Sequence, residues 1–281
     1  MTPWLFPGQP LRREAALPDD DDFRAIERLC SERCGFELRE HRPLPGRLLS
    51  EQTLLQLYGV ALSLYRTRRL RAAGQRPDLI AEHSLGIYAA LAACGSISEA
   101  EALELAARIG SCMAVMGQAR CYALGCPVGL AVGPVEAAAR NNGVYLANYN
   151  TSRHFLLAGE ADKMAAALEE CRLAGAFSVS AFACEAPLHT PLMAEIGGQL
   201  AAIVADYSYA EPTVPLLEHI SQRMLSAAAM PAFLVDELQQ PVWWERSWLK
   251  LRSLGAVRGC EVGSGSALSK FNRWIDSEVT P

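Results

Sequence analysis

The 281-residue sequence predicts an α/β protein with a second, smaller domain inserted into its chain. Three observations support this fold class. A short apolar strand at 78–81 turns abruptly into an Ala-rich helix at 86–94. The region 121–186 alternates strand and helix patterns in the order βαββαβ, which is the ferredoxin-like arrangement. A strand at 260–262 then ends in a Gly-rich turn before a terminal helix, so the chain on both sides of the insertion is α/β.

Composition limits the classes of protein to consider. The chain is 51% hydrophobic and 20% charged, which predicts a substantial core. A net charge of −5 argues against broad nucleic-acid binding. The nine cysteines form no C-x-x-C pair and favour free thiols in a reducing compartment, without a metal site. A signal-peptide pattern and an apolar run of about 18 residues are both missing, so we expect a cytoplasmic protein that does not enter a membrane.

The N-terminal region begins with a minimal strand, 4–6, that ends in Pro7-Gly8-Gln9-Pro10. Four aspartates at 19–22 precede an amphipathic segment, and we expect them to cap a helix there. Residues 35–50 are rich in Pro and Gly and predict a loop. Apolar residues at three- and four-residue spacing then predict a long helix at 51–73.

The end of this long helix is strongly basic. Cations stabilise the C-terminal end of a helix, so a solvated face is the leading interpretation. A surface for an anionic partner is the alternative. The residues concerned are Arg66, Arg68, Arg69, Arg71 and Arg76.

Ser84 lies where the strand at 78–81 turns into the helix at 86–94. This is the geometry of a nucleophile elbow, in which a tight turn exposes the hydroxyl and a helix N-terminus points N–H groups at the reacting carbonyl. Gly86 supplies the second glycine of the usual Gly-x-Ser-x-Gly pattern, but Glu82 replaces the first. Glu82 is therefore expected to project outward or to strain the turn. An ordinary helix cap at Ser84 is the alternative.

The remaining elements follow from periodicity and caps. Ser98 and Glu101 form a capping-box pattern at the start of a helix at 98–116. The inserted domain contains strands at 124–132, 144–150, 154–158 and 176–184, with helices at 134–141 and 161–173. Beyond it we expect helices at 192–206, 231–238, 243–254 and 267–275, and an extended segment at 211–219. We interpret His41, His154 and His219 as structural.

Six stretches in this order resemble the malonyl-CoA:acyl carrier protein transacylase family, which includes the acyltransferase domains of fatty acid and polyketide synthases. The resemblance covers essentially the whole chain. It implies an α/β-hydrolase-like large domain of residues 1–120 and 187–281, with the ferredoxin-like small domain at 121–186. The six stretches are Phe6–Gln9, Pro77–Leu91, Ala147–Thr151, Leu188–Met193, Gln240–Trp244 and Glu261–Gly265.

The implied chemistry is acyl transfer through an ester on Ser84. A serine hydroxyl needs a base to take its proton, and the resemblance assigns that role to His189. A backbone carbonyl near Gln240 would hold the imidazole, so that the pair works as a Ser–His dyad. The backbone N–H groups of Gln9 and Leu85 would bind the oxyanion.

The resemblance also implies the pocket and the partners. His83 would line the acyl pocket and Asn148 would help to order it. The substrate would be an acyl-CoA, and the acceptor an acyl carrier protein with its own phosphopantetheine, so neither a cofactor nor a metal is expected. An acidic carrier protein would be a partner for the arginines at 66–76.

One departure from the family concerns the acyl group. Malonyl-specific members place an arginine four residues before a methionine, where it binds the malonyl carboxylate. Counting back from Met113 gives Ile109, while Arg108 is turned away by one helical step of about 100°. Without a guanidinium in a dry pocket, malonyl should bind poorly and a neutral acyl group is favoured.

Other departures keep alternatives open. Ile87 replaces a family glutamate, Pro10 replaces a glycine in the loop that carries Gln9, and Glu82 replaces the elbow glycine. An acyl-carrier-protein hydrolase would use the same dyad but admit water to the acyl-enzyme. A non-catalytic, acyltransferase-like subunit is the remaining alternative.

Overall fold

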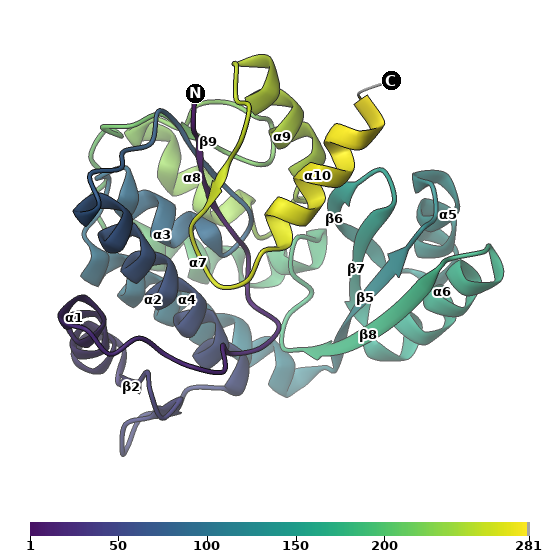
Figure 1. The fold of residues 1–281 in the computed structure, drawn as a ribbon. Helices are drawn as coiled ribbons and strands as arrows, with labels where there is room; N and C mark the ends of the chain where they lie inside the picture. The colour runs from purple at the N-terminus through teal and green to yellow at the C-terminus, as the bar shows by residue number, and fades with distance from the viewer. Residues whose placement is uncertain (280–281) are drawn as a thin grey trace.

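Two separate four-stranded sheets organise the chain, of which the computed structural model describes residues 1–279 (Figure 1). The sheet of the larger lobe is parallel, in the order β10-β1-β4-β9. Its strands are very short, so each contributes few residues to the edge where the chain turns into loops. They are β1 (Trp4–Phe6), β4 (Ile80–Glu82), β9 (Leu216–Leu217) and β10 (Cys260–Glu261).

Helices cover both faces of this sheet. Alternate residues of β1 show the two layers, because Trp4 and Phe6 pack into one apolar core and Leu5 packs into another. The first core contains α1 (Asp21–Leu29), α2 (Glu51–Ala72), α3 (Gly86–Ala93), α4 (Glu99–Ala119), α7 (Gly197–Ala205) and α8 (Met230–Asp236). The second contains α9 (Trp244–Ser253) and α10 (Ala267–Val279). The expected α/β architecture of the large lobe is therefore present.

The helix caps expected from the sequence are confirmed. The Asp20 side chain accepts a hydrogen bond of 2.9 Å from the N–H of Phe23 at the start of α1. Ser98 and Glu101 form a reciprocal capping box at the start of α4. Such caps satisfy backbone donors that have no partner inside the helix.

Local structure differs from expectation in three places. The expected loop at 35–50 contains a small hairpin of β2 (Phe36–Glu37) and β3 (Arg42–Pro43), reached through a π-helical turn at Cys30–Cys34. The helix expected at 192–206 begins as a 3₁₀ turn at Pro191–Ile196, since the proline fits the first turn, and another 3₁₀ turn precedes α8 at Ala227–Ala229. Only β9 of the extended segment 211–219 pairs with the sheet.

The smaller lobe has its own antiparallel sheet and core, and its elements follow the expected βαββαβ order. The strand order is β6-β7-β5-β8, and Phe155, Leu157 and Met164 are among its buried residues. The elements are β5 (Tyr122–Val128), α5 (Val132–Asn142), β6 (Tyr145–Thr151), β7 (His154–Glu160), α6 (Ala161–Leu173) and β8 (Ser178–Cys184). We propose 121 and 186 as the limits of this lobe.

Strand β6 joins the two lobes. The N–H of Val242 donates to the carbonyl of Ala147, and the N–H of Tyr149 donates to the carbonyl of Val242, both at 2.8 Å. The Tyr149 ring stacks on Trp243 at a centroid distance of 3.8 Å. Asn148, in the same strand, is thereby held against the larger lobe, where Figure 1 shows β6 beside α10.

Among residues 1–279, no helix combines the length and the apolar character that crossing a bilayer requires.

We predict that Gly86→Ala strongly destabilises the protein. A Cβ at this position would lie 2.2 Å from the carbonyl oxygen of Phe6, so β1 and the start of α3 would have to separate. The free energy of unfolding should fall by at least about 2 kcal/mol, measured by urea denaturation.

Gly198→Ala is the matched control. Gly198 lies in α7, and a Cβ there meets no atom within 4 Å. This substitution should stabilise the protein by about 0.5–1 kcal/mol, because alanine has the higher helix propensity. Equal effects of the two substitutions would contradict the close packing of β1 behind the elbow.

Candidate active site

Ser84 occupies a sharp turn between β4 and α3. Its φ angle is 55°, in the left-handed region that residues other than glycine rarely adopt. Gly86 makes this turn possible, because the backbone of β1 passes directly behind it and leaves no space for a side chain. The side chain of Ser84 is half-buried at the start of α3, so the structure has the geometry of the expected elbow.

His189 lies against Ser84 although 105 residues separate them. The distance from Ser84 Oγ to His189 Nε2 is 2.6 Å, and His189 Nδ1 donates to the carbonyl oxygen of Glu237 at 2.7 Å. A carbonyl oxygen only accepts hydrogen bonds, so Nδ1 carries the hydrogen and Nε2 has a free lone pair. His189 is therefore in the tautomer that accepts a proton from Ser84.

The carbonyl that holds His189 belongs to Glu237, three residues before Gln240, where we expected it. Glu237 caps the C-terminal end of α8, and the last carbonyls of a helix lack partners within the helix. That leaves the Glu237 oxygen free for the imidazole, while the backbone of Gln240 has a smaller effect on His189. The carbonyl that we expected near Gln240 is thus supplied chiefly by Glu237, three residues earlier in the chain.

Burial keeps His189 neutral. Its side chain is 2% exposed, and the loss of solvent, followed by the nearby His219, lowers the pKa of His189 to about 3. Removing a cation from water is costly, so the uncharged imidazole is the stable form at neutral pH. The backbone of His189 also adopts a positive φ of 60°, so both members of the dyad are held in strained conformations.

The two backbone donors that we expect at the oxyanion site are free of partners within residues 1–279. Neither the N–H of Leu85, which precedes α3, nor that of Gln9 donates a hydrogen bond to an atom of residues 1–279. The side chain of Gln9 is held separately, since its Oε1 accepts from Gln56 Nε2 at 3.2 Å. Free N–H groups at a helix N-terminus suit a developing oxyanion. The roles of Gln9 and Leu85 remain predictions.

The small lobe supplies the partners of His83. His83 Nε2 lies 2.9 Å from Asn150 Oδ1 and 3.5 Å from Asn148 Nδ2, and burial lowers the pKa of His83 to about 4. Asn148 is thus near His83, as expected, but Asn150 makes the shorter hydrogen bond and was missed. The sequence did contain a signal, since residues two apart on a strand share a face.

Ile109 is fully buried in α4, within the core of the larger lobe. The neighbouring Arg108 points away, as expected, because its guanidinium donates to Asp206 Oδ2 at 2.5 Å and lies over the Tyr207 ring. Among the buried polar residues of 1–279 there are three glutamates but neither lysine nor arginine. The interior around the dyad therefore offers no cation for a substrate carboxylate.

Glu82 is fully buried and paired, so it does not project outward, which was one of the two alternatives that we expected. Its Oε1 accepts from the N–H of His219 at 3.0 Å and lies 2.8 Å from His219 Nδ1. His219, which we had interpreted as structural, is itself completely buried. The pair was missed because 137 residues separate its members, which no local periodicity reveals.

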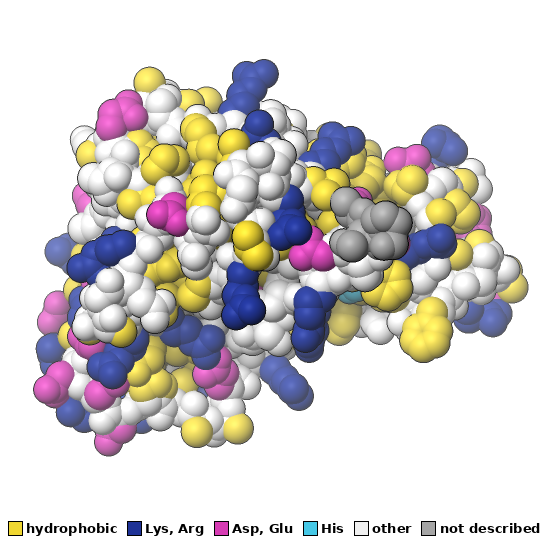
Figure 2. Space-filling model, turned by 45° about the horizontal axis from the view of Figure 1, so that its top comes forward, with side chains coloured by type: hydrophobic (Ala, Val, Ile, Leu, Met, Phe, Trp, Pro, Cys, Tyr) yellow, Lys and Arg dark blue, Asp and Glu magenta, His cyan; other side chains and the backbone are white. Residues whose placement is uncertain are grey.

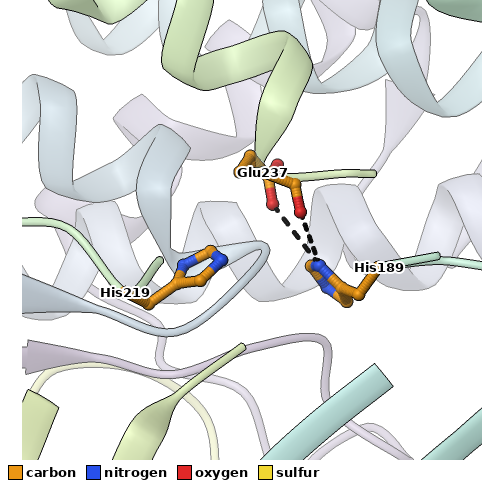
Figure 3. A group of neighbouring side chains, drawn as sticks. All are labelled: His189, His219 and Glu237. Carbon is orange, nitrogen blue, oxygen red and sulfur yellow. Dashed lines mark hydrogen bonds and ion pairs between the residues drawn. The ribbon is translucent and has the colours of Figure 1, made fainter. Parts of the chain in front are cut away.

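His189, His219 and Glu237 form a buried cluster (Figure 3). One nitrogen or oxygen atom of each lies within 4.8 Å of the others, and two imidazoles with a carboxylate are ligands that Zn²⁺ accepts. However, both ring nitrogens of His189 already have hydrogen-bond partners. A metal would have to displace Ser84 or the Glu237 carbonyl, so we assign none to this cluster.

The basic residues after the middle of α2 are largely used within the chain. Arg66 pairs with Glu14, Arg68 pairs with Glu99, and Arg71 donates to the carbonyl of Ala93. Arg69 lies 3.4 Å from Asp22 but keeps half of its side chain exposed. Arg76 is exposed and donates to nearby backbone carbonyls. The expected solvated face is therefore only partly present, because Arg66 and Arg68 are paired within the protein while Arg69, Arg71 and Arg76 remain exposed.

Comparison with known proteins gives a consistent result. The acyl transferase domain family matches residues 39–265. The chain is 27% identical to the malonyl CoA-acyl carrier protein transacylase of Escherichia coli K12, over 99% of this chain and 93% of that protein.

Solved structures share the fold. The malonyl-CoA:acyl carrier protein transacylase of Xanthomonas oryzae superposes with a TM-score of 0.89 at 29% identity, covering 99% of this chain and 93% of that one. A type II polyketide synthase malonyl-transacylase, solved in complex with its acyl carrier protein, has a TM-score of 0.88 at 24% identity, covering 98% and 93%.

We predict that the reactivity of Ser84 stays constant as the pH falls through the usual range of histidine. His189 has its pKa lowered from 6.5 to about 3, so the base remains neutral well below pH 6.5. The rate of Ser84 labelling by a fluorophosphonate should therefore be flat between about pH 5 and pH 8.

The control for this profile is His189→Gln, which removes the base and should abolish labelling. A wild-type rate that fell by half near pH 6.5 would show a solvated imidazole and contradict the buried site.

Proposed function

Because the chain belongs to the acyl transferase domain family, with malonyl-CoA:acyl carrier protein transacylases among its relatives, we propose that it moves an acyl group from coenzyme A to an acyl carrier protein through an ester on Ser84. The observation that carries this proposal is the 2.6 Å contact between Ser84 Oγ and the lone-pair nitrogen of His189. A hydroxyl with an oriented base beside it is an activated nucleophile.

In the first half-reaction, Ser84 Oγ attacks the thioester carbonyl while its proton moves to His189 Nε2. The N–H groups of Gln9 and Leu85 bind the oxyanion, and loss of one such donor typically costs about 3 kcal/mol of barrier. The C–S bond then breaks, and the leaving thiolate takes the proton from His189. In the second half-reaction, the carrier-protein thiol gives its proton to His189 and attacks the ester on Ser84. The bond from Ser84 Oγ to the acyl carbon then breaks, and Oγ takes the proton back from His189.

We propose that the acyl group is neutral. Ile109 is a buried hydrocarbon where malonyl-specific members of the family have an arginine, and Arg108 is engaged with Asp206. The buried Asp, Glu, Lys and Arg side chains of residues 1–279 are three glutamates. A malonyl carboxylate in this dry region would lack a hydrogen-bonding cation.

The acceptor that we propose is an acyl carrier protein, supported by the relative that was solved in complex with one. If these arginines contribute to that contact, Arg69, Arg71 and Arg76 are the best placed, because they remain exposed. Arg66 and Arg68 are less exposed and pair with Glu14 and Glu99.

We predict covalent acylation of Ser84, measured by intact mass after incubation with acetyl-, longer acyl- and malonyl-CoA. Acetyl or longer groups should load at least about tenfold faster than malonyl, since one unmatched buried charge costs more than 1.4 kcal/mol. Ser84→Ala should lose the adduct while remaining folded.

The fate of the adduct separates the related activities. Transfer to a holo-carrier protein supports the transferase, whereas rapid release of free acid in its presence indicates the hydrolase. If wild-type protein forms no adduct with any thioester, the chain is a non-catalytic subunit and the proposal fails.

We predict that Ile109→Arg raises malonyl loading relative to acetyl loading. A guanidinium at this position would meet the malonyl carboxylate in a region that excludes water, where such a charged hydrogen bond is worth about 1.5–3 kcal/mol. The ratio of the two acylation rates should change by about tenfold or more.

Ile109→Met is the matched control, because it changes the shape of the side chain without adding charge. Melting curves of both variants establish that they are folded. An unchanged ratio in folded Ile109→Arg protein would show that residue 109 does not contact the acyl group.

A further inference from the structure

A row of buried acidic and imidazole side chains, formed by Glu237, His219 and Glu82, extends behind the dyad. The mechanism above does not use these side chains. The carboxyl group of Glu237 has Oε2 at 3.8 Å from His189 Nδ1. Beyond it lies His219, whose Nδ1 contacts both oxygens of Glu82 at 2.8 and 2.9 Å. The side chains of Glu237, His219 and Glu82 are all at most 1% exposed.

Two atoms of the row formed by Glu237, His219 and Glu82 lack a hydrogen-bond partner within residues 1–279. They are Nε2 of His219 and Oε2 of Glu237. Figure 3 shows a ring nitrogen of His219 turned toward His189 and Glu237, and the cluster atoms lie within 4.8 Å of one another. A small rotation of the carboxyl group, or one bridging water, joins two such atoms. An unpartnered buried polar atom is costly, so this pair has a reason to interact.

The protonation states of the two atoms are complementary. Oε1 of Glu82 accepts from the backbone N–H of His219, and both carboxyl oxygens of Glu82 lie within 2.9 Å of His219 Nδ1. With the ring hydrogen on Nδ1 and directed at Glu82, Nε2 of His219 carries a lone pair. No donor within residues 1–279 binds the carboxyl group of Glu237, and its burial raises the pKa well above the usual value. Burial and the missing donor at Oε2 both favour the protonated form of Glu237, and His219 Nε2 lies in the same cluster as an acceptor for that proton.

We infer that Glu237 is a positioning residue whose carboxyl proton passes to His219 Nε2 as Ser84 gives its proton to His189. The transfer leaves a carboxylate 3.8 Å from the newly formed His189 imidazolium and places the His219 cation against Glu82. Charges of opposite sign then alternate along the row from His189 to Glu82, and this alternation stabilises the His189 cation where water is excluded. Both protons return when the leaving thiolate takes the proton from His189, so none is gained or lost.

Other titratable groups lie around this row of Glu237, His219 and Glu82, on the surrounding elements. Tyr88 of α3 faces Glu237, His83 faces His189, and Glu218 faces His219. The carboxylate of Glu218 is already bound by backbone N–H groups, including that of Ile220 at 2.6 Å. Among the His, Cys, Asp and Glu side chains of residues 1–279, the group that brings both His189 and His219 together has Glu237 as its third member.

This inference rests on the proposed role of Ser84 and His189, but its test does not need a thioester. The test uses the 281-residue protein and measures the rate at which a fluorophosphonate labels Ser84 over a range of pH. Glu237→Gln keeps the backbone carbonyl for His189 and removes the transferable proton, so the plateau rate should fall about tenfold, which corresponds to about one pKa unit at His189. His219→Gln should give a similar fall.

The double variant supplies the decisive comparison. Because either single change interrupts the same transfer, Glu237→Gln with His219→Gln should be no slower than the slower single variant. Glu261→Gln is the control, since its carboxylate caps α10 through Leu268 and Ser269 and contacts neither imidazole. A plateau rate of Glu237→Gln within twofold of wild type, or additive losses in the double variant, would overturn the inference.

A measurement on wild-type protein covers the case of variants that do not fold. An alkylboronic acid forms a negatively charged tetrahedral adduct on Ser84, and ¹⁵N NMR of labelled histidines reports each ring nitrogen. We expect His219 Nε2 to be unprotonated in the free protein and protonated in the adduct. An unchanged state of Nε2 overturns the inference. Failure of thioester loading with normal labelling and boronate binding overturns only the proposed function.

Discussion

The hydrogen bond from His189 Nδ1 to the Glu237 carbonyl is the interaction on which the site depends. It fixes the tautomer, and the tautomer decides whether Nε2 can take the proton of Ser84. Its acceptor is a backbone atom that a helix end leaves free, so it brings no charge into a dry interior. The rest of the large lobe then has to bring three distant pieces together, which are the elbow after β4, the turn before α7 and the end of α8.

The exclusion of water from this interior also explains the pKa values of the titratable groups around the dyad. Three histidines near Ser84 have lowered pKa values because burial disfavours their cations, and the glutamates among them have raised values for the corresponding reason. A buried network of this composition is stable when acids and imidazoles share protons and is unstable when each group is charged separately. The neutral acyl group that we propose is compatible with this network and with the hydrocarbon at Ile109.

Local chemistry in the sequence was sufficient for much of the fold. The acidic cap at Asp20, the capping box at Ser98 and the βαββαβ order each rest on short-range patterns, and each is present. The elbow turn was also visible locally, through Gly86. The Glu82–His219 pair was not, because it is made by tertiary packing across β4 and the end of β9. The acceptor of His189 was expected near Gln240 from the resemblance to the family, and the 2.7 Å hydrogen bond is made to Glu237, three residues earlier.

The attachment of β6 to Val242 has a consequence for engineering the chain by exchange of parts. The amides that face His83 come from the small lobe, while His83 itself comes from the elbow of the large one. The small lobe is therefore not an independent module. A chimera that imports a different insertion would have to reproduce the spacing of Asn148 and Asn150 along one strand and the main-chain pairing with Val242. A chimera that lacks this pairing would leave His83 without the amide partners that Asn148 and Asn150 supply.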